Sequence, residues 1–164
     1  MKYILLICCL VCLGIQSYAQ LVVRIDEDKD YIQLLEKRLK ESKTDSAKAI
    51  NALRLSYFYR KYQKMDLSKQ RLDQGVALAK GHRMMEGIAK YFEAYSVLGT
   101  EDLAATDSRL ISSDSLLKDI HDPEAKKYQS GVWIIRGLIK QLQGNEKGRD
   151  ESLYQPRISL GHRI

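Results

Sequence analysis

Histidines are the residues of this 164-residue chain best suited to metal binding or proton transfer, and there are three: His82, His121 and His162. His82 and Glu86 are four residues apart, so a helix through them would place both side chains on one face. That pair supplies only two ligands, whereas a zinc site in a protein usually has three or four. Each histidine is also expected at a helix end or in the C-terminal tail, where it would interact with terminal carbonyl groups. The histidines therefore predict no metal site.

Motifs for nucleophilic or phosphate chemistry are missing from the sequence. No H-E-x-x-H, G-x-S-x-G or glycine-rich phosphate loop occurs. The three cysteines, Cys8, Cys9 and Cys12, all lie within the first 19 residues. We therefore expect no catalytic residue, no cofactor and no enzymatic activity. A metal, or a turnover that depends on the histidine and glutamate pair, would contradict this expectation.

The first 19 residues have the order of a secretory signal peptide. Lys2 precedes an apolar run over residues 4–15, and small residues lead to Ala19. The run is shorter than the roughly 20 residues that a membrane-spanning helix needs. We expect cleavage after Ala19 and export to the periplasm or secretion from the cell. An uncleaved membrane anchor is the alternative.

Composition places residues 20–164 among globular proteins. The sequence is 29% charged and has only two prolines, and its length suits one domain with its own core. A net charge of +6 could favour nucleic acid. However, basic and acidic residues are mixed, as in "EDKDYIQLLEKRLKESKTD", which is typical of a solvated helix surface. We expect no nucleic-acid partner, and membrane contact only through the signal peptide or a span beyond residue 164.

Apolar residues recur at helical spacing throughout residues 20–164, and no strand-like alternation is found. This pattern predicts an all-α fold of about seven helices, with an N-terminal helix within 20–44, helical repeats over 45–154 and an irregular tail over 155–164. The predicted buried stripes include Ile32, Leu35 and Leu39; Ala52, Leu55, Tyr59 and Tyr62; Leu72, Val76 and Ala79; Ile88, Tyr91, Tyr95 and Leu98; Leu103, Leu110 and Leu117; and Tyr128, Val132, Ile135, Ile139 and Leu142.

Helix start and stop signals separate these stripes. Asp66 is expected to cap a helix that opens at Leu67, and Thr100 one that opens at Glu101. In "HDPEAK", Asp122 is the expected cap and the proline follows at the first helical position. Glycines at 81, 99 and 144 fall where the preceding helices should end. The connections are short, so neighbouring helices should be antiparallel.

A helix pair repeats along the chain. "YQKMDLSKQRLDQGVALAK" aligns with "LGTEDLAATDSRLISSDSLLK", and an aromatic-rich helix precedes each. A third copy begins at Ala125 and turns at "QGNEKG". The period is roughly 36 to 44 residues, within the range of helical solenoids.

The repeat resembles the tetratricopeptide repeat. Leu55-Ser56-x-x-Tyr59 resembles the L-G-x-x-Y core of that motif, and Trp133 and Gly137 stand at the spacing of its tryptophan and glycine. "VALAK" resembles the end of its second helix. The register of the second copy stays open, since it can start from Tyr91 or from Phe92. The resemblance implies an α-α superhelix of about three helix pairs.

The resemblance also implies a binding groove lined by the first helix of each pair, and a protein or peptide ligand. Basic and aromatic side chains there would suit an acidic or extended peptide. For Phe58 and Trp133 the alternative is a place in the core between repeats, because large aromatics are usually buried. The candidate groove residues are Arg54, Phe58 and Lys61 in the first repeat, Lys90 and Glu93 in the second, and Gln129, Trp133, Arg136 and Lys140 in the third.

The Ala-Gln signal ending, the segment "EGIAKYF" and the repeat length resemble one bacterial group. It comprises the exported tetratricopeptide regions of sensor histidine kinases and related regulators, chiefly from Bacteroidetes. That resemblance implies the sensory or interaction region of a two-component signalling protein. "PRISLGHRI" lacks a helical stripe, so we expect a truncated frame or the N-terminal part of a longer protein. A free-standing periplasmic scaffold is the alternative.

Overall fold

Residues 28–99 and 102–144 are described by the computed structural model of the chain. Within these two ranges every regular element is an α-helix and no strand occurs, which confirms the all-α class. The predicted signal peptide, residues 145–154 of the predicted repeat region and the predicted tail lie outside the described residues.

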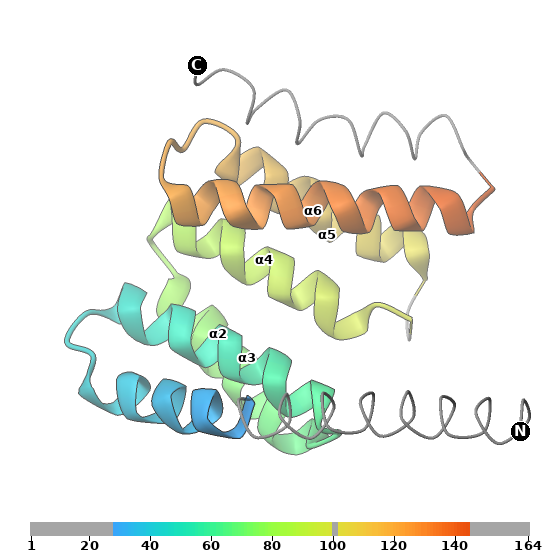
Figure 1. Ribbon diagram of the computed structural model, residues 1–164. Coiled ribbons are helices and arrows are strands. Elements are labelled where there is room, and N and C mark those ends of the chain that lie inside the picture. The colour runs from blue at the N-terminus through green and yellow to red at the C-terminus, as the bar shows by residue number, and fades with distance from the viewer. Residues whose placement is uncertain (1–27, 100–101, 145–164) are drawn as a thin grey trace, which may run out of the picture.

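The described ranges fold as a succession of helices joined by short turns (Figure 1). An N-terminal helix occupies residues 28–41. Five further helices follow it: α2 (Asp45–Lys61), α3 (Met65–Ala79), α4 (Arg83–Val97), α5 (Leu103–Leu117) and α6 (Pro123–Leu142).

Local signals set most helix ends where the sequence predicts them. Asp122 caps α6, and its side chain accepts hydrogen bonds from the backbone N–H groups of Glu124 and Ala125. Two residues beyond α3, α4 and α6, glycines take left-handed φ angles of 82°, 86° and 72°, a conformation that costs a glycine little. These glycines are Gly81, Gly99 and Gly144.

Two predicted helix starts are wrong. α3 begins at Met65 after Lys64, so Asp66 lies inside the first turn and is not the cap. The Lys64 carbonyl already accepts the Ser68 N–H at 2.9 Å, and the Asp66 carboxylate is left to interact with the helix dipole. α5 begins at Leu103 and is capped by the Asp102 side chain, in place of the predicted Thr100, which lies outside the described residues.

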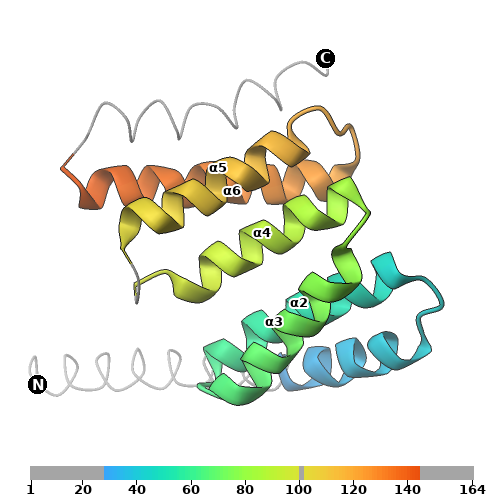
Figure 2. The ribbon, with the colours of Figure 1, turned by 180° about the vertical axis from the view of Figure 1, so that it is seen from behind.

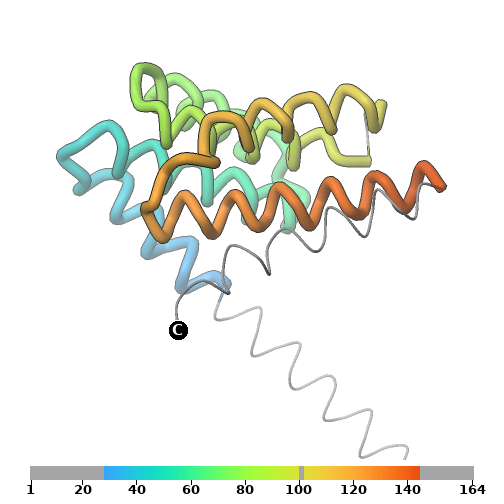
Figure 3. Tube along the Cα trace, turned by 90° about the horizontal axis from the view of Figure 1, so that it is seen from above, coloured from blue at the N-terminus to red at the C-terminus, as the bar shows by residue number. Residues whose placement is uncertain are grey.

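The helices lie in two layers. α2, α4 and α6 form one layer together with the N-terminal helix, and α3 and α5 form the other (Figures 1 and 2). Consecutive helices from α2 to α6 pack against each other, and α4 also contacts α2 and α6 within its own layer. Figure 3 shows the layers edge-on, with α3 and α5 on the side opposite to α6 and the N-terminal helix. We call the face formed by α2, α4, α6 and the N-terminal helix the inner face.

The hydrophobic core runs through the stack as three clusters. Leu35 and Leu55 join the N-terminal helix to α2. Leu53, Ile88 and Leu117 belong to a central cluster that also includes residues of α3 and α6. The third cluster joins α4, α5 and α6, with Ala94, Leu110, Val132, Trp133, Ile135 and Ile139 as its buried members. Burial is therefore distributed between successive helices, as a stacked arrangement requires.

Candidate functional site

Six aromatic rings form a continuous line across the inner face. The line starts on the N-terminal helix, crosses α2 and α4 and ends on α6. Successive ring centroids are 5.2 to 6.4 Å apart, within the range at which aromatic rings attract each other. We call this line the aromatic seam; its members, in order, are Tyr31, Phe58, Tyr57, Tyr95, Tyr91 and Tyr128.

Helix packing leaves the seam half-buried. Only Tyr128 is fully buried, at 6% exposure, and the other five rings are partly exposed. A glycine on α6 makes room for the α4 part of the seam, because a Cβ atom at Gly131 would lie 3.0 Å from the Tyr91 ring. The seam thus combines fixed positions with surface that another molecule can contact.

Burial raises the pKa of the three seam tyrosines on α4 and α6, which are Tyr91, Tyr95 and Tyr128. It raises the pKa of Tyr91 to about 12, and the neighbouring Tyr128, Tyr95 and Tyr57 rings add to the effect. The pKa of Tyr95 is also raised, by burial and by the charge and hydroxyl of Tyr57. The neutral hydroxyl groups of Tyr91 and Tyr95 can each donate and accept a hydrogen bond.

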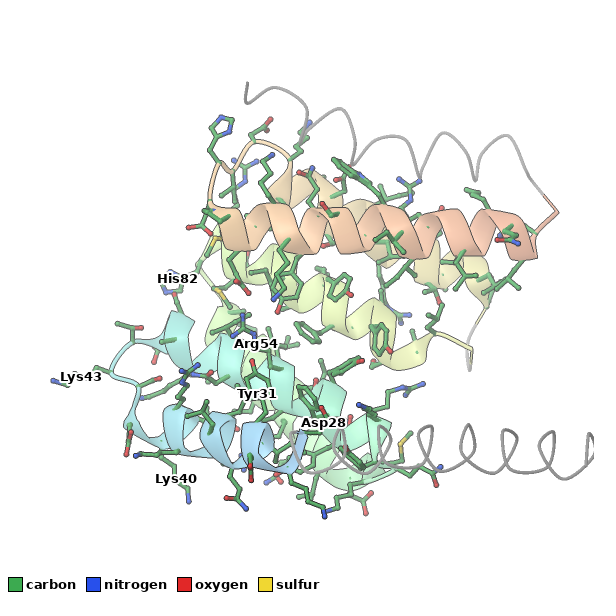
Figure 4. All side chains as sticks on the ribbon, in the orientation of Figure 1. Asp28, Tyr31, Lys40, Lys43, Arg54 and His82 are labelled. Carbon is green, nitrogen blue, oxygen red and sulfur yellow. The ribbon has the colours of Figure 1, made fainter. Side chains whose placement is uncertain are left out.

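Arg54 joins α2 to α6 across the inner face (Figure 4). Its Nε donates a hydrogen bond to the Tyr128 hydroxyl at 3.4 Å, and its Nη2 forms an ion pair with the Glu124 carboxylate. Burial lowers the pKa of Arg54, but the hydrogen bonds and charges of Tyr128 and Glu124 outweigh it and leave the pKa above its ordinary value. A charged guanidinium is thus held at the end of the seam, with its side chain 21% exposed.

The remaining first-repeat candidates bind the N-terminal helix. Phe58 packs against the cluster of Leu35 and Leu55, as its alternative interpretation expects. Lys61 forms an ion pair with Asp28, whose carboxylate also accepts the Tyr62 hydroxyl at 2.8 Å. Of the three, only Arg54 and Phe58 therefore belong to the inner-face site.

The four α6 candidates do not line a groove, which corrects the expectation of one exposed face. Trp133 is 9% exposed and lies in the third core cluster. Gln129 is 3% exposed and donates to Asp114 of α5 at 2.9 Å. Arg136 and Lys140 both bind Asp107 of α5, at 2.7 and 3.4 Å. All four side chains are used within the α5–α6 interface and the core.

Lys90 and Glu93 lie on the opposite side of α4 from the seam. They pair with each other at 2.8 Å and line a pocket formed with α3 and α5. On a helix of 3.6 residues per turn, Glu93 points away from Tyr91 and Tyr95, and Lys90 lies about 100° around the helix from Tyr91. The nine predicted groove residues therefore lie in four separate places: the inner face, the contact with the N-terminal helix, the α5–α6 interface with the core, and the pocket between α3, α4 and α5.

The seam tyrosines and Glu124 were not among the sequence candidates for binding. The apolar stripes include Tyr91, Tyr95 and Tyr128, and this pattern predicts that the three side chains lie in the core. The ten tyrosines in the chain, against two phenylalanines, were the available signal, because a hydroxyl at the ring tip favours half-buried positions. Glu124 was interpreted only as a first-turn acid, since its partner is 70 residues away in the sequence.

Within residues 28–99 and 102–144, no group of three or more His, Cys, Asp or Glu side chains is placed to hold a metal ion. Across the same ranges, no helix has both the length and the apolar character needed to cross a membrane. No protein-family model, curated protein or solved structure matches the chain.

Proposed function

We propose that the helices form a tetratricopeptide-like module that binds a segment of a protein partner on its inner face. The aromatic seam carries this proposal, because it presents partly exposed rings from the N-terminal helix, α2 and α4 in one line that ends at the buried Tyr128 of α6. The paired and layered helices support the repeat assignment, as do the motif-like residues Leu55, Ser56 and Tyr59.

The chemistry of the seam suits an extended peptide with apolar and acidic residues. Rigid tyrosine rings offer large contact area at little entropic cost and are common at the centres of interfaces. Arg54 at the end of the seam could exchange Glu124 for a carboxylate of the partner, because Glu124 is 32% exposed and the guanidinium can bind a carboxylate through two N–H groups.

Selection of a phage-displayed random peptide library on the immobilised chain tests this proposal. We expect enriched clones to contain aromatic or aliphatic residues next to Asp or Glu. Titration of one enriched peptide into ¹⁵N-labelled protein should shift the amide resonances of Tyr57, Tyr91 and Tyr95. The Arg54→Ala and Tyr95→Ala variants should each bind that peptide about tenfold or more weakly, as expected for interface anchors.

A matched control is available on the other layer. Lys69 of α3 has a side chain 77% exposed, and Lys69→Ala should bind the peptide like the unmodified chain. Circular dichroism melts of each variant separate loss of binding from loss of folding. Absence of enriched peptides, or amide shifts confined to α3 and α5, would contradict an inner-face site.

The biological setting forms part of the same proposal and rests on the sequence resemblance. We place the module outside the inner membrane, as the sensory or interaction region of a two-component signalling protein. Sequencing of the gene beyond residue 164 tests this setting, since a membrane span and an output domain should follow in frame. The alternative, a free-standing periplasmic scaffold, would instead keep stable partners in a pull-down from envelope extracts.

A further inference from the structure

A hollow lies on the side of α4 that faces away from the seam. It is a pocket of about 200 Å³. Its apolar floor comes from α3, α4 and α5, and its rim consists of charged side chains from α3 and α4. The floor residues are Val76, Ala79, Ala89 and Leu116, and the rim residues are Lys80, Glu86, Lys90 and Glu93.

The two rim carboxylates are already bonded within the chain. Glu86 accepts the backbone N–H of Gly81 at 2.9 Å, and Glu93 accepts Lys90 at 2.8 Å. Lys80 is exposed, and no partner for its ammonium group is found among the described residues. The rim therefore has one cation left to attract a ligand, next to an apolar floor.

We propose that this pocket holds one leucine-sized apolar side chain of a protein partner, with an acidic residue beside it bound to Lys80. The volume is below the roughly 300 to 1,000 Å³ of pockets that hold drug-sized ligands, so a single side chain fits better than a cofactor. Burial of a side chain of that size in an apolar pocket is favourable, because its apolar surface leaves water. An aliphatic anchor in a pocket with a polar rim is one arrangement that binding interfaces use.

This site is independent of the inner-face proposal. Glu86 and Glu93 lie on one face of α4, and Tyr91 and Tyr95 lie on the opposite face at 3.6 residues per turn. A partner could contact both faces only by passing around the edge of the stack. Each site can thus be present without the other.

Fluorescence anisotropy with a labelled peptide of sequence Gly-Ser-Glu-Leu-Glu-Ser-Gly tests the proposal on the full chain. Two control peptides replace the leucine by serine or both glutamates by lysine. We expect the serine peptide to bind at least about tenfold more weakly, since the apolar transfer is lost. The lysine peptide should bind more weakly still, because its charge repels Lys80.

Protein variants locate the binding. K80E should weaken the leucine peptide about three- to tenfold, while K40E, the same charge change on the N-terminal helix (Figure 4), should leave it unchanged. V76Y fills the pocket floor and should abolish the leucine preference, with a thermal melt to verify folding. Equal binding of all three peptides, or no binding of any, would overturn the proposal. Binding that is lost in R54A but kept in K80E would overturn it as well, and would support the inner-face site instead.

Discussion

Tyr91 is a member of the aromatic seam whose pKa depends on its burial. It packs on Gly131 and contacts the Tyr95 and Tyr128 rings. Burial raises its pKa from an ordinary 10.0 to about 12. Ionisation in the folded state therefore costs more than ionisation in the unfolded chain, because the phenolate would lose water and lie near other tyrosines.

This difference predicts a loss of stability at alkaline pH. The folded pKa lies above the unfolded one, so the stabilisation is fully present below pH 10 and is lost as the pH rises from 10 to 12. The loss from Tyr91 should be about 2 to 3 kcal/mol, because each pKa unit corresponds to roughly 1.4 kcal/mol. In urea titrations, Tyr91→Phe should reduce the fall in the free energy of unfolding between pH 10 and 12. Absorbance at 295 nm should show one tyrosine fewer ionising near pH 12 in the variant, and a lost signal near pH 10 would refute the assignment.

Asp107 shows what sequence reasoning does not reveal about single residues. It is buried at 7% exposure although it is charged, because Arg136 and Lys140 both bind it. The sequence shows a helix with mixed charges, and such charges are usually solvated. Which two cations face which acid depends on the rotation of α6 against α5. Because α6 is rotated in this way, Arg136 and Lys140 point toward α5 and do not line the expected groove.

At the scale of helices, the sequence predicts helix ends more reliably than contacts between helices. The Asp122 cap and the three glycine stops act on neighbouring backbone groups, and the sequence therefore located them. The start of α3 was misplaced by two residues because Lys64 offers no side-chain cap while Asp66 resembles one. The sequence around Gly75 gives no local indication that α2 and α3 approach each other closely there.

Gly75 lies inside α3, where alanine would ordinarily gain about 1 kcal/mol of helix propensity. We expect Gly75→Ala to destabilise the protein by about 1 to 3 kcal/mol instead. A Cβ atom there would lie 2.6 and 2.7 Å from Cγ and Cδ2 of Leu53, which is fully buried. Chemical denaturation followed by circular dichroism measures the change.

A double-mutant cycle gives the control for this prediction. Leu53→Ala removes Cγ and Cδ2 and leaves only the backbone nitrogen of residue 53, at 3.2 Å, close to the added Cβ. This substitution should itself cost about 2 to 5 kcal/mol, because it leaves a cavity. In that background Gly75→Ala should be neutral or stabilising, since the added methyl group fills part of the cavity. Additive effects of the two substitutions would show that the helices do not depend on this contact.

At the scale of the whole molecule, the sequence indicated stacked helix pairs but not which side chains of non-consecutive helices meet. Periodicity reports which face of each helix is apolar, and the predicted stripes at Leu35, Ile88 and Val132 are buried. The side-chain contact between α2 and α6 depends on the angles between successive helices, which are not encoded at any one position. Arg54 was therefore expected to face a ligand, whereas it reaches across α4 to Glu124 and Tyr128.

The Arg54 bridge should hold α2 and α6 at their present separation. Arg54→Ala removes the ion pair and the hydrogen bond to Tyr128, and we expect a loss of about 1 to 3 kcal/mol in the free energy of unfolding. Without the bridge, α2 and α6 should sample a wider range of separations. Spin labels at Asp45→Cys and Lys127→Cys, with Cys8, Cys9 and Cys12 replaced by serine, report this distribution by double electron–electron resonance.

Arg83 provides the matched arginine control for the bridge. It pairs with Asp119 at 3.5 Å, and both side chains are more than half exposed, so Arg83→Ala should change stability by less than about 0.5 kcal/mol. In the Arg83→Ala variant, the distances between the two spin labels should match those in the chain that retains Arg83. If Arg54→Ala behaves like Arg83→Ala in both measurements, packing within the seam alone sets the separation of α2 and α6. If the distribution broadens only in Arg54→Ala, a carboxylate that displaces Glu124 would also be able to open the inner face, which links ligand binding to the shape of the stack.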